Sequence, residues 1–166
     1  MLQPTTGRYL AAVAGGGARI GHGVTWEPLR FDSIPPEAPP RLLTSIWLNM
    51  PHAMPGLRST ARRLGSEDPE VSPYGIIVRQ FVPPTHRFDA LIGLPSRVDH
   101  IMAWEWDFAA ADLIVREAGG AFSDAWGRRF RYNKPVPRNE GGVVLSVDPG
   151  TQERVLAAIR PELPPR

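Results

Sequence analysis

The sequence contains no cysteine among its 166 residues. This absence excludes disulfide bonds, thiolate metal ligands and a cysteine nucleophile. The sequence also has no apolar run of the roughly 18–20 residues that a membrane helix needs, and its N-terminus lacks the basic and then apolar order of a signal peptide. We therefore expect a soluble, cytoplasmic protein of a single domain's length, without a membrane partner.

Lysine is nearly absent, since Lys134 is the only lysine among 19 basic residues, and the formal net charge is only +2. The arginines form two clusters, Arg58/Arg62/Arg63 and Arg128/Arg129/Arg131. Such clusters are more often solvated faces than nucleic-acid surfaces when the net charge is small. We expect no nucleic-acid partner.

Proline and glycine are abundant, at 19 and 16 residues, and they divide the chain into short elements. The stretch GRYLAAVAGGGARIGHG predicts a β-hairpin that turns at glycines 15–17, because glycine adopts the positive φ angles of a tight reversal. A phosphate-binding glycine loop is the alternative, but Gly21, Gly23 and Pro28 leave no room for the helix that such a loop must open. The prolines of residues 27–40 predict a linker, which gives a hairpin at 1–26 and an α/β lobe at 41–166.

The lobe combines apolar strand patterns with helical patterns, which indicates a layered α/β fold. Two short apolar stretches, YGIIVRQF and RFDALIG, are compatible with either a helix or a strand. The other expected elements are a buried strand at Arg41–Leu48, a helix at Gly56–Leu64 ended by Gly65, a helix from about Asp107 to Ala118 ended by Gly119-Gly120, two strands around a Trp126-Gly127 turn, a strand in GGVVLSV, and a last helix in PGTQERVLAAIR with Thr151 as its cap.

Histidine and hydroxyl residues give no recognisable catalytic pattern. The four histidines, at positions 22, 52, 86 and 100, are scattered, and neither G-x-S-x-G nor H-E-x-x-H occurs in the sequence. Nucleophilic catalysis by a triad therefore has no support from the sequence.

Asp107 has two interpretations. As an N-cap it would accept amide hydrogen bonds and stabilise its helix by about 1 kcal/mol. As a metal ligand it would hold a hard cation, and the small side chains of the following FAAA turn would let a phosphate approach the free amides at the helix start. These residues can then form one phosphate and metal site.

The stretch WDFAAADLIVREAGGAFSDAWGRRFRYN, followed by GGVVLSVDPGTQERVLAAI, resembles the C-terminal signature of the inositol monophosphatase family. That family includes inositol phosphatases, histidinol phosphatases, fructose bisphosphatase-like enzymes and bisphosphate nucleotidases. The hairpin RYLAAVAGGGARIGHG is similar to the strand-turn-strand that precedes the second lobe of the family. The resemblance implies the layered α/β sandwich of a C-terminal lobe, with a hairpin left from the first lobe.

The resemblance also implies Mg²⁺-dependent hydrolysis of a phosphomonoester of the inositol phosphate, histidinol phosphate or nucleotide bisphosphate class, so the expected partner is a small phosphorylated metabolite. A homodimer and a first lobe outside this chain are the alternative macromolecular partners. The implied site consists of Asp107 as metal ligand, Trp106, Ala109 and Ala110 as supporting residues, and Gly65-Ser66 as a substrate contact, for which Ser72 is an equal alternative. Asp89-Ala90 matches the family's D-A motif.

Two other metal-binding elements of the family, an upstream glutamate and a D-P-x-D-G-T segment, do not occur in this sequence. Mg²⁺ needs near-octahedral oxygen coordination, and Asp107 alone cannot hold two or three ions. We therefore expect a C-terminal portion of a phosphatase that is nearly inactive on its own. The alternative is a non-catalytic binding module derived from the same fold.

Overall fold

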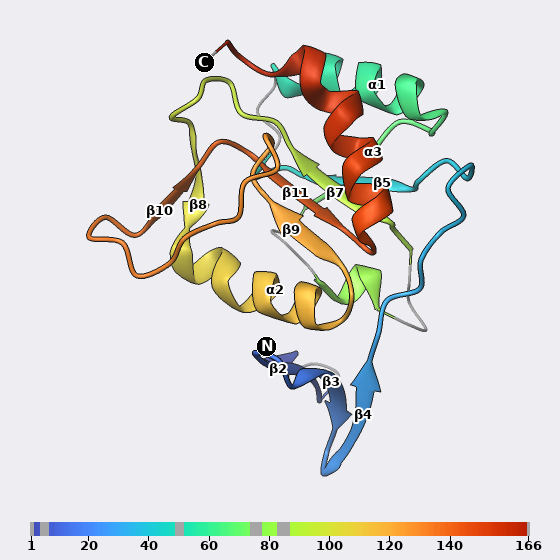
Figure 1. Ribbon diagram of the computed structural model, residues 1–166, viewed down its shortest axis with the longest axis vertical. Helices are drawn as coiled ribbons and strands as arrows, with labels where there is room; N and C mark the ends of the chain where they lie inside the picture. The colour runs from blue at the N-terminus through green and yellow to red at the C-terminus, as the bar shows by residue number, and fades with distance from the viewer. Residues whose placement is uncertain (1, 4–6, 49–51, 74–77, 83–86, 166) are drawn as a thin grey trace.

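The computed structural model describes residues 2–3, 7–48, 52–73, 78–82 and 87–165 (Figure 1). Its centre is a five-stranded mixed sheet with the strand order β6-β5-β7-β11-β9. Strand β5 runs parallel to β6 and β7, whereas β11 is antiparallel to both β7 and β9. The strands are β5 (Leu42–Ser45), β6 (Glu70–Ser72), β7 (Ala90–Gly93), β9 (Ala121–Ser123) and β11 (Val143–Ser146). The predicted layered α/β fold is confirmed.

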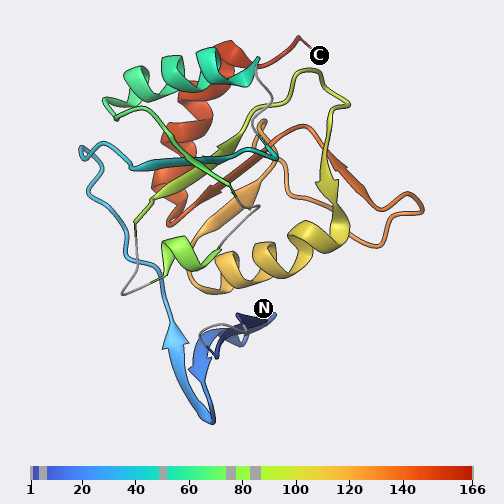
Figure 2. The ribbon, with the colours of Figure 1, turned by 180° about the vertical axis from the view of Figure 1, so that it is seen from behind.

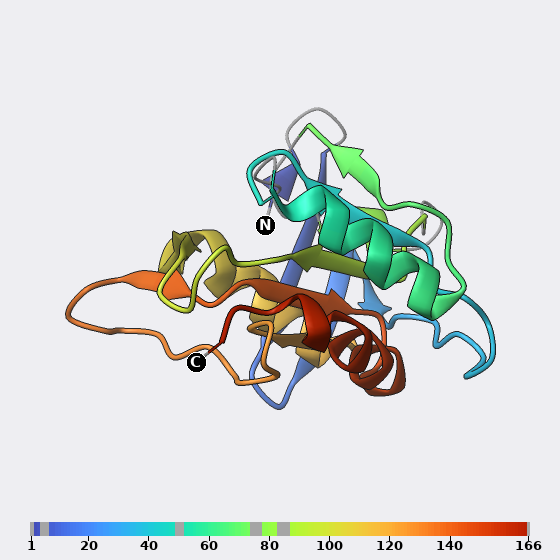
Figure 3. The same ribbon diagram turned by 90° about the horizontal axis from the view of Figure 1, so that it is seen from above.

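Helices cover both faces of this sheet. Helix α1 (Ala53–Leu64) and helix α3 (Pro149–Ile159) lie side by side on one face (Figure 3). Helix α2 (Glu105–Glu117) covers the opposite face (Figure 2). Because successive strand residues point to opposite faces, Val144 packs in the α1/α3 layer and Leu145 in the α2 layer. Burial on both faces explains why the central strands are continuous apolar runs.

A second sheet, below α2 in Figure 1, is built from the N-terminal residues. Its antiparallel strands are β1 (Leu2–Gln3), β2 (Arg8–Val13), β3 (Gly17–His22) and β4 (Thr25–Leu29). The sheet packs on α2, and Leu10, Ala18 and Leu29 join the core on that side. The predicted hairpin is confirmed. The predicted linker at 27–40 starts too early, because residues 27–29 pair with β3 at an edge where Pro28 is tolerated.

The glycine turn of the hairpin binds a carboxylate at the end of α2. The amides of Gly15 and Gly17 donate to Glu117 Oε1 and Oε2 at 2.8 and 2.9 Å. Both glycines have a positive φ, 71° and 80°, which directs their amides toward one point. These two hydrogen bonds lower the pKa of Glu117. The turn thus ties the N-terminal sheet to the end of α2 by binding the Glu117 carboxylate, and it is not a phosphate loop.

We expect the Glu117→Gln variant to be less stable than the wild type at neutral pH and equally stable in acid. A carboxylate with a lowered pKa contributes stability above its ordinary value of 4.5, and this contribution disappears as the pH falls through the lowered pKa. Thermal unfolding of both proteins between pH 3 and 7, at about one-unit steps, measures the difference. A difference that does not change with pH would contradict a role for the charge.

A short two-stranded antiparallel sheet contains the strand that leads directly into α2. It pairs β8 (Ile101–Trp104) with β10 (Arg138–Glu140). The prediction of two strands around the Trp126-Gly127 turn is half wrong, since only β9 forms. Asp124 instead accepts hydrogen bonds from the amides of Trp126 and Arg128 and from Arg128 Nε, and the chain then continues without regular structure until β10.

The other predicted elements are found with shifted ends. The predicted strands at residues 41–48 and 141–147 are confirmed as β5 and β11. Helix α1 ends at Gly65, with φ 69°, as predicted, but begins at Ala53. The cap of α3 is Asp148, whose Oδ1 accepts the Thr151 amide at 2.8 Å, and not Thr151 itself.

Two stretches are compatible with either a helix or a strand from their sequence alone. RFDALIG contains β7, and the described end of YGIIVRQF is the 3₁₀ turn η1 (Val78–Phe81), whereas residues 74–77 lie outside the described residues. A second 3₁₀ turn, η2 (Arg160–Glu162), follows α3. Among the residues that the structure describes, no helix combines the length and the apolar composition needed to cross a bilayer.

Candidate functional site

Asp107 lies in the first turn of α2, with its side chain exposed. The helix starts at Glu105 and its N-cap residue is Trp104, so the interpretation of Asp107 as the N-cap residue is wrong. Asp107 is three residues further along, and its Oδ2 accepts the Trp104 amide at 2.9 Å. Its Oδ1 receives no hydrogen bond from any described residue. One oxygen therefore holds the start of the helix, and the other can take a ligand.

A cleft of about 560 Å³ opens beside Asp107. Three segments line it: Trp47 and Leu48 after β5, strand β8, and the start of α2 with Asp107 and Phe108. Among the described residues of this lining, Asp107 is the only ionisable one. The volume lies within the range of about 300–1,000 Å³ that is typical of small-molecule sites.

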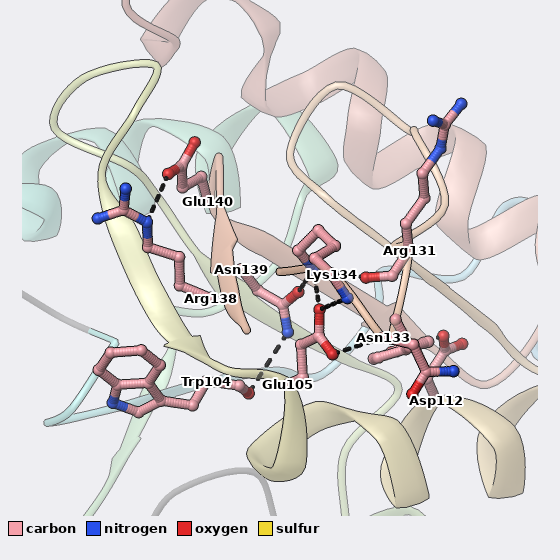
Figure 4. Close-up of polar contacts among 10 residues, drawn as sticks. Trp104, Glu105, Asp112, Arg131, Asn133, Lys134, Arg138, Asn139 and Glu140 are labelled. Carbon is pink, nitrogen blue, oxygen red and sulfur yellow. Dashed lines mark hydrogen bonds and ion pairs between the residues drawn. The ribbon is translucent and has the colours of Figure 1, made fainter. Parts of the chain in front are cut away.

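Glu105 also belongs to the first turn of α2, but its side chain points toward Lys134 and Asn133, away from the Trp104 ring (Figure 4). Its carboxylate pairs with Lys134 Nζ at 2.6 Å and accepts the amide of Asn133 at 2.7 Å. The hydrogen bond from Lys134 is the main reason for the lowered pKa of Glu105. Glu105 thus anchors the loop before β10 to the helix start, so it is not placed to be a second metal ligand.

Asp112 is a second acidic residue of α2 with a structural role. It is buried and accepts hydrogen bonds from Tyr132 Oη at 2.8 Å and from Arg116 Nε at 2.6 Å. Burial and the hydrogen bond to Asp112 raise the pKa of Tyr132. Asp112 therefore ties the same loop to the middle of the helix, a role that no sequence pattern had indicated.

The described residues do not form a complete magnesium site. None of the groups of His, Asp and Glu within the described ranges brings three or more side chains together around one point. Mg²⁺ prefers near-octahedral oxygen coordination, of which Asp107 supplies one ligand. The carboxylate chemistry of Asp107 fits Mg²⁺, but it supplies only one ligand among the described residues.

Gly65 and Ser66 lie in a different cleft, with Pro40 and Arg41 at the start of β5. Gly65 ends α1, and Ser66 Oγ donates to the carbonyl of Pro40 at 2.7 Å. Trp47, beside Asp107, follows the other end of β5. The structure therefore does not bring Gly65-Ser66 to Asp107, and their role as a substrate contact stays a prediction.

Ser72 ends β6 and pairs with Ser45 at the end of β5, so it lies at the same sheet edge as Trp47. Asp89 of the D-A motif is buried and binds Arg41, whose Nη2 lies 2.8 Å from Asp89 Oδ1. Ser72 therefore lies at the end of β5 that leads to Trp47 and Asp107, whereas Ser66 lies at the other end. Asp89 is bound to Arg41 inside the protein.

The predicted supporting residues surround the start of α2. The Trp106 ring is exposed and stacks on Trp104, with ring centroids 5.2 Å apart and planes 8° from parallel. Ala109 is half-buried and Ala110 is exposed. Because α2 starts at Glu105, Ala109 and Ala110 lie in its second turn, so the expectation that the small side chains form the first turn is wrong. Their functional role stays a prediction.

Comparisons with known proteins agree with the sequence resemblance. Residues 84–163 match the model of the inositol monophosphatase family. A 3'(2'),5'-bisphosphate nucleotidase of Emericella nidulans is 35% identical over 74 residues, which are 43% of this chain and 20% of that protein.

Solved structures extend the likeness to most of the chain. SuhB of Mycobacterium tuberculosis matches 93% of this chain and 54% of its own, with a TM-score of 0.63 and 21% identity. An inositol monophosphatase from Zymomonas mobilis matches 87% of this chain and 53% of its own, with a TM-score of 0.56 and 20% identity. The chain thus spans about half the length of these proteins. Residues 84–163 are thus similar to the inositol monophosphatase family, and the chain has the fold of the corresponding part of these solved structures.

Proposed function

We propose that this chain provides the C-terminal lobe of a Mg²⁺-dependent phosphomonoester hydrolase, in which Asp107 is one ligand of the metal. The observation that carries the proposal is the exposed Asp107 carboxylate, held in the first turn of α2 at the edge of a cleft of ligand size. The match of residues 84–163 to a phosphatase family supports it.

When bound, Mg²⁺ would polarise the phosphate and activate the attacking water. The residues of this chain position these partners. The Trp104 amide fixes Asp107, and the Glu105–Lys134 pair holds the helix start from the other side. The positive end of the helix dipole favours a phosphate near the first turn, where the Glu105 amide already donates to the Pro137 carbonyl, and Ala109 and Ala110 follow in the second turn.

The substrate classes in question are inositol phosphates, histidinol phosphate and nucleotide bisphosphates. The similarity to a bisphosphate nucleotidase supports the third class. A homodimer, or a first lobe that supplies the missing carboxylates, would complete the site.

A non-catalytic binding module is the second candidate. The observation in its favour is the isolation of Asp107, since no cluster of three ligating side chains exists within the described part of the chain. A single carboxylate binds Mg²⁺ weakly, because the ion gives up its water reluctantly.

Phosphate release in the presence of Mg²⁺ distinguishes the two candidates. We expect the chain alone to release almost no phosphate from small phosphomonoesters. Co-expression with an N-terminal half of a family protein, carrying the D-P-x-D-G-T segment, should restore Mg²⁺-dependent release. If both halves form a complex that stays inactive with all three substrate classes, the chain is a binding module. Hydrolysis by the chain alone would instead refute the incomplete site.

A further inference from the structure

Two of the five tryptophans, Trp47 and Trp104, line the Asp107 cleft, and a third, Trp106, stacks on Trp104. Trp47, Trp104 and Trp106 are 73%, 43% and 65% exposed, respectively. Ile46 and Ile101, beside them in the sequence, are exposed as well. A group of exposed aromatic side chains in one place is a mark of a binding surface, because isolated apolar side chains are common on surfaces but clusters are not.

The geometry of these rings suits a flat ligand. Trp104 and Trp106 already form a parallel stack, and Trp104 also lines the cleft. Its ring points away from the Glu105–Lys134 network (Figure 4). Trp47 lines the same cleft from another segment, at the end of β5. A ring that enters the cleft meets indole surface from two parts of the chain.

The remaining walls are apolar, with Leu48, Ile101, Met102, Ala103 and Phe108, and Asp107 is the only charged side chain among the described lining residues. A polyhydroxylated ring would find few side-chain partners there for the hydrogen bonds that it gives up to enter, because the remaining polar atoms of the lining belong to the backbone and the indole N–H groups. An aromatic heterocycle instead has a π-face that stacks on indole, whichever base it is. The lining therefore favours a nucleobase over an inositol ring.

We propose that Trp47 and Trp104 form a stacking subsite for the planar aromatic base of a nucleotide substrate. The proposal rests on the proposed function in one respect, namely that the substrate's phosphate is held at Asp107. The subsite itself needs neither metal nor phosphate. It selects the nucleotide class among the phosphomonoesters of this family through side chains of this chain.

Adenosine tests the subsite without phosphate and without Mg²⁺. We expect adenosine to bind the whole chain in isothermal titration calorimetry, and myo-inositol not to bind at the same concentrations. Trp104→Ala and Trp47→Ala should each weaken adenosine binding about tenfold, whereas Trp104→Phe, which keeps an aromatic face, should retain most of the affinity. Trp26→Ala is the matched control, since Trp26 is also partly exposed and packs on another aromatic ring, Tyr9, but lies in the N-terminal sheet. It should leave the affinity unchanged.

Three outcomes would overturn the subsite: no adenosine binding, equal binding of adenosine and myo-inositol, or equal effects of the Trp104 and Trp26 substitutions. Self-association of the chain that Trp104→Ala and Trp104→Phe both abolish would also overturn it, because the rings would then contact a second copy. Circular dichroism shows whether each variant is folded. Adenosine binding does not depend on hydrolysis, so failure of the phosphatase proposal and failure of the subsite give different results.

Discussion

Asp107→Asn should lower Mg²⁺-dependent phosphate release by at least about 100-fold when the chain is combined with a metal-binding N-terminal half. Loss of residues that only support metal ligands already costs about 10–100-fold, and Asp107 is proposed as a direct ligand. The amide oxygen of Asn can still accept the Trp104 amide, so the local structure is retained. Phosphate release over a range of Mg²⁺ concentrations measures the effect.

The same substitution separates a metal-binding role of Asp107 from a role that only stabilises the start of the helix through the Trp104 amide. The free energy of unfolding of Asp107→Asn should fall by less than about 1 kcal/mol, since only a charge near an exposed helix start is lost. Asp107→Ala, which removes the hydrogen bond as well, is the matched variant and should be less stable. If Asp107→Asn keeps full turnover while Asp107→Ala is unstable, Asp107 is only a capping residue and the proposed metal site is wrong.

Phe108→Ala should lower the free energy of unfolding by about 3–5 kcal/mol, the usual cost of emptying a buried phenylalanine site. Phe108 is 1% exposed and makes edge-to-face contacts with Phe122 and Phe130, at centroid distances of 5.5 and 5.1 Å. It thereby joins the start of α2 to β9 and to the loop that follows. Urea unfolding, followed by far-UV circular dichroism, measures the loss.

Two variants control for this prediction. Phe108→Leu keeps an apolar side chain and should lose less than the alanine variant. Val24→Ala, at a position 97% exposed in the turn between β3 and β4, should change the stability by less than about 0.5 kcal/mol. A loss of less than about 1 kcal/mol in Phe108→Ala would show that the three rings do not hold the helix start.

Local patterns predicted most of the elements correctly because they depend on neighbouring residues. Glycines 15–17 impose a reversal wherever the hairpin packs, and Gly65 ends α1 through its own backbone conformation. The apolar runs of β5 and β11 are long enough to indicate buried strands. The same patterns predicted the start of α2 only to within two residues, since Trp104 carries none of the usual side-chain signals of an N-cap.

The predicted strand after Trp126 is absent because of one local contact, made by Asp124, and of distant contacts to α2 that the local sequence does not reveal. Asp124 captures the amides of Trp126 and Arg128, which makes a turn more favourable than a strand. The chain beyond it is then held by Glu105 and Asp112 of α2, each more than 15 residues away in the sequence. Residues 129–132, RFRY, alternate between polar and aromatic residues, as strands do, so this pattern favours a strand here.

The sequence by itself determined the fold class, the position of the Asp107 helix and the resemblance to a phosphatase family, because these depend on periodicity, on glycine and on a contiguous motif. Only the tertiary structure decided what each acidic residue of α2 does. It directs Glu105 to Lys134, Asp112 to Tyr132 and Glu117 to the glycine turn, and leaves Asp107 exposed at a cleft. It also places Trp47 and Trp104, which are more than 50 residues apart in the sequence, in the lining of the same cleft. The side chains that surround a carboxylate decide whether it binds its own protein or a ligand, and these neighbours come from distant parts of the chain.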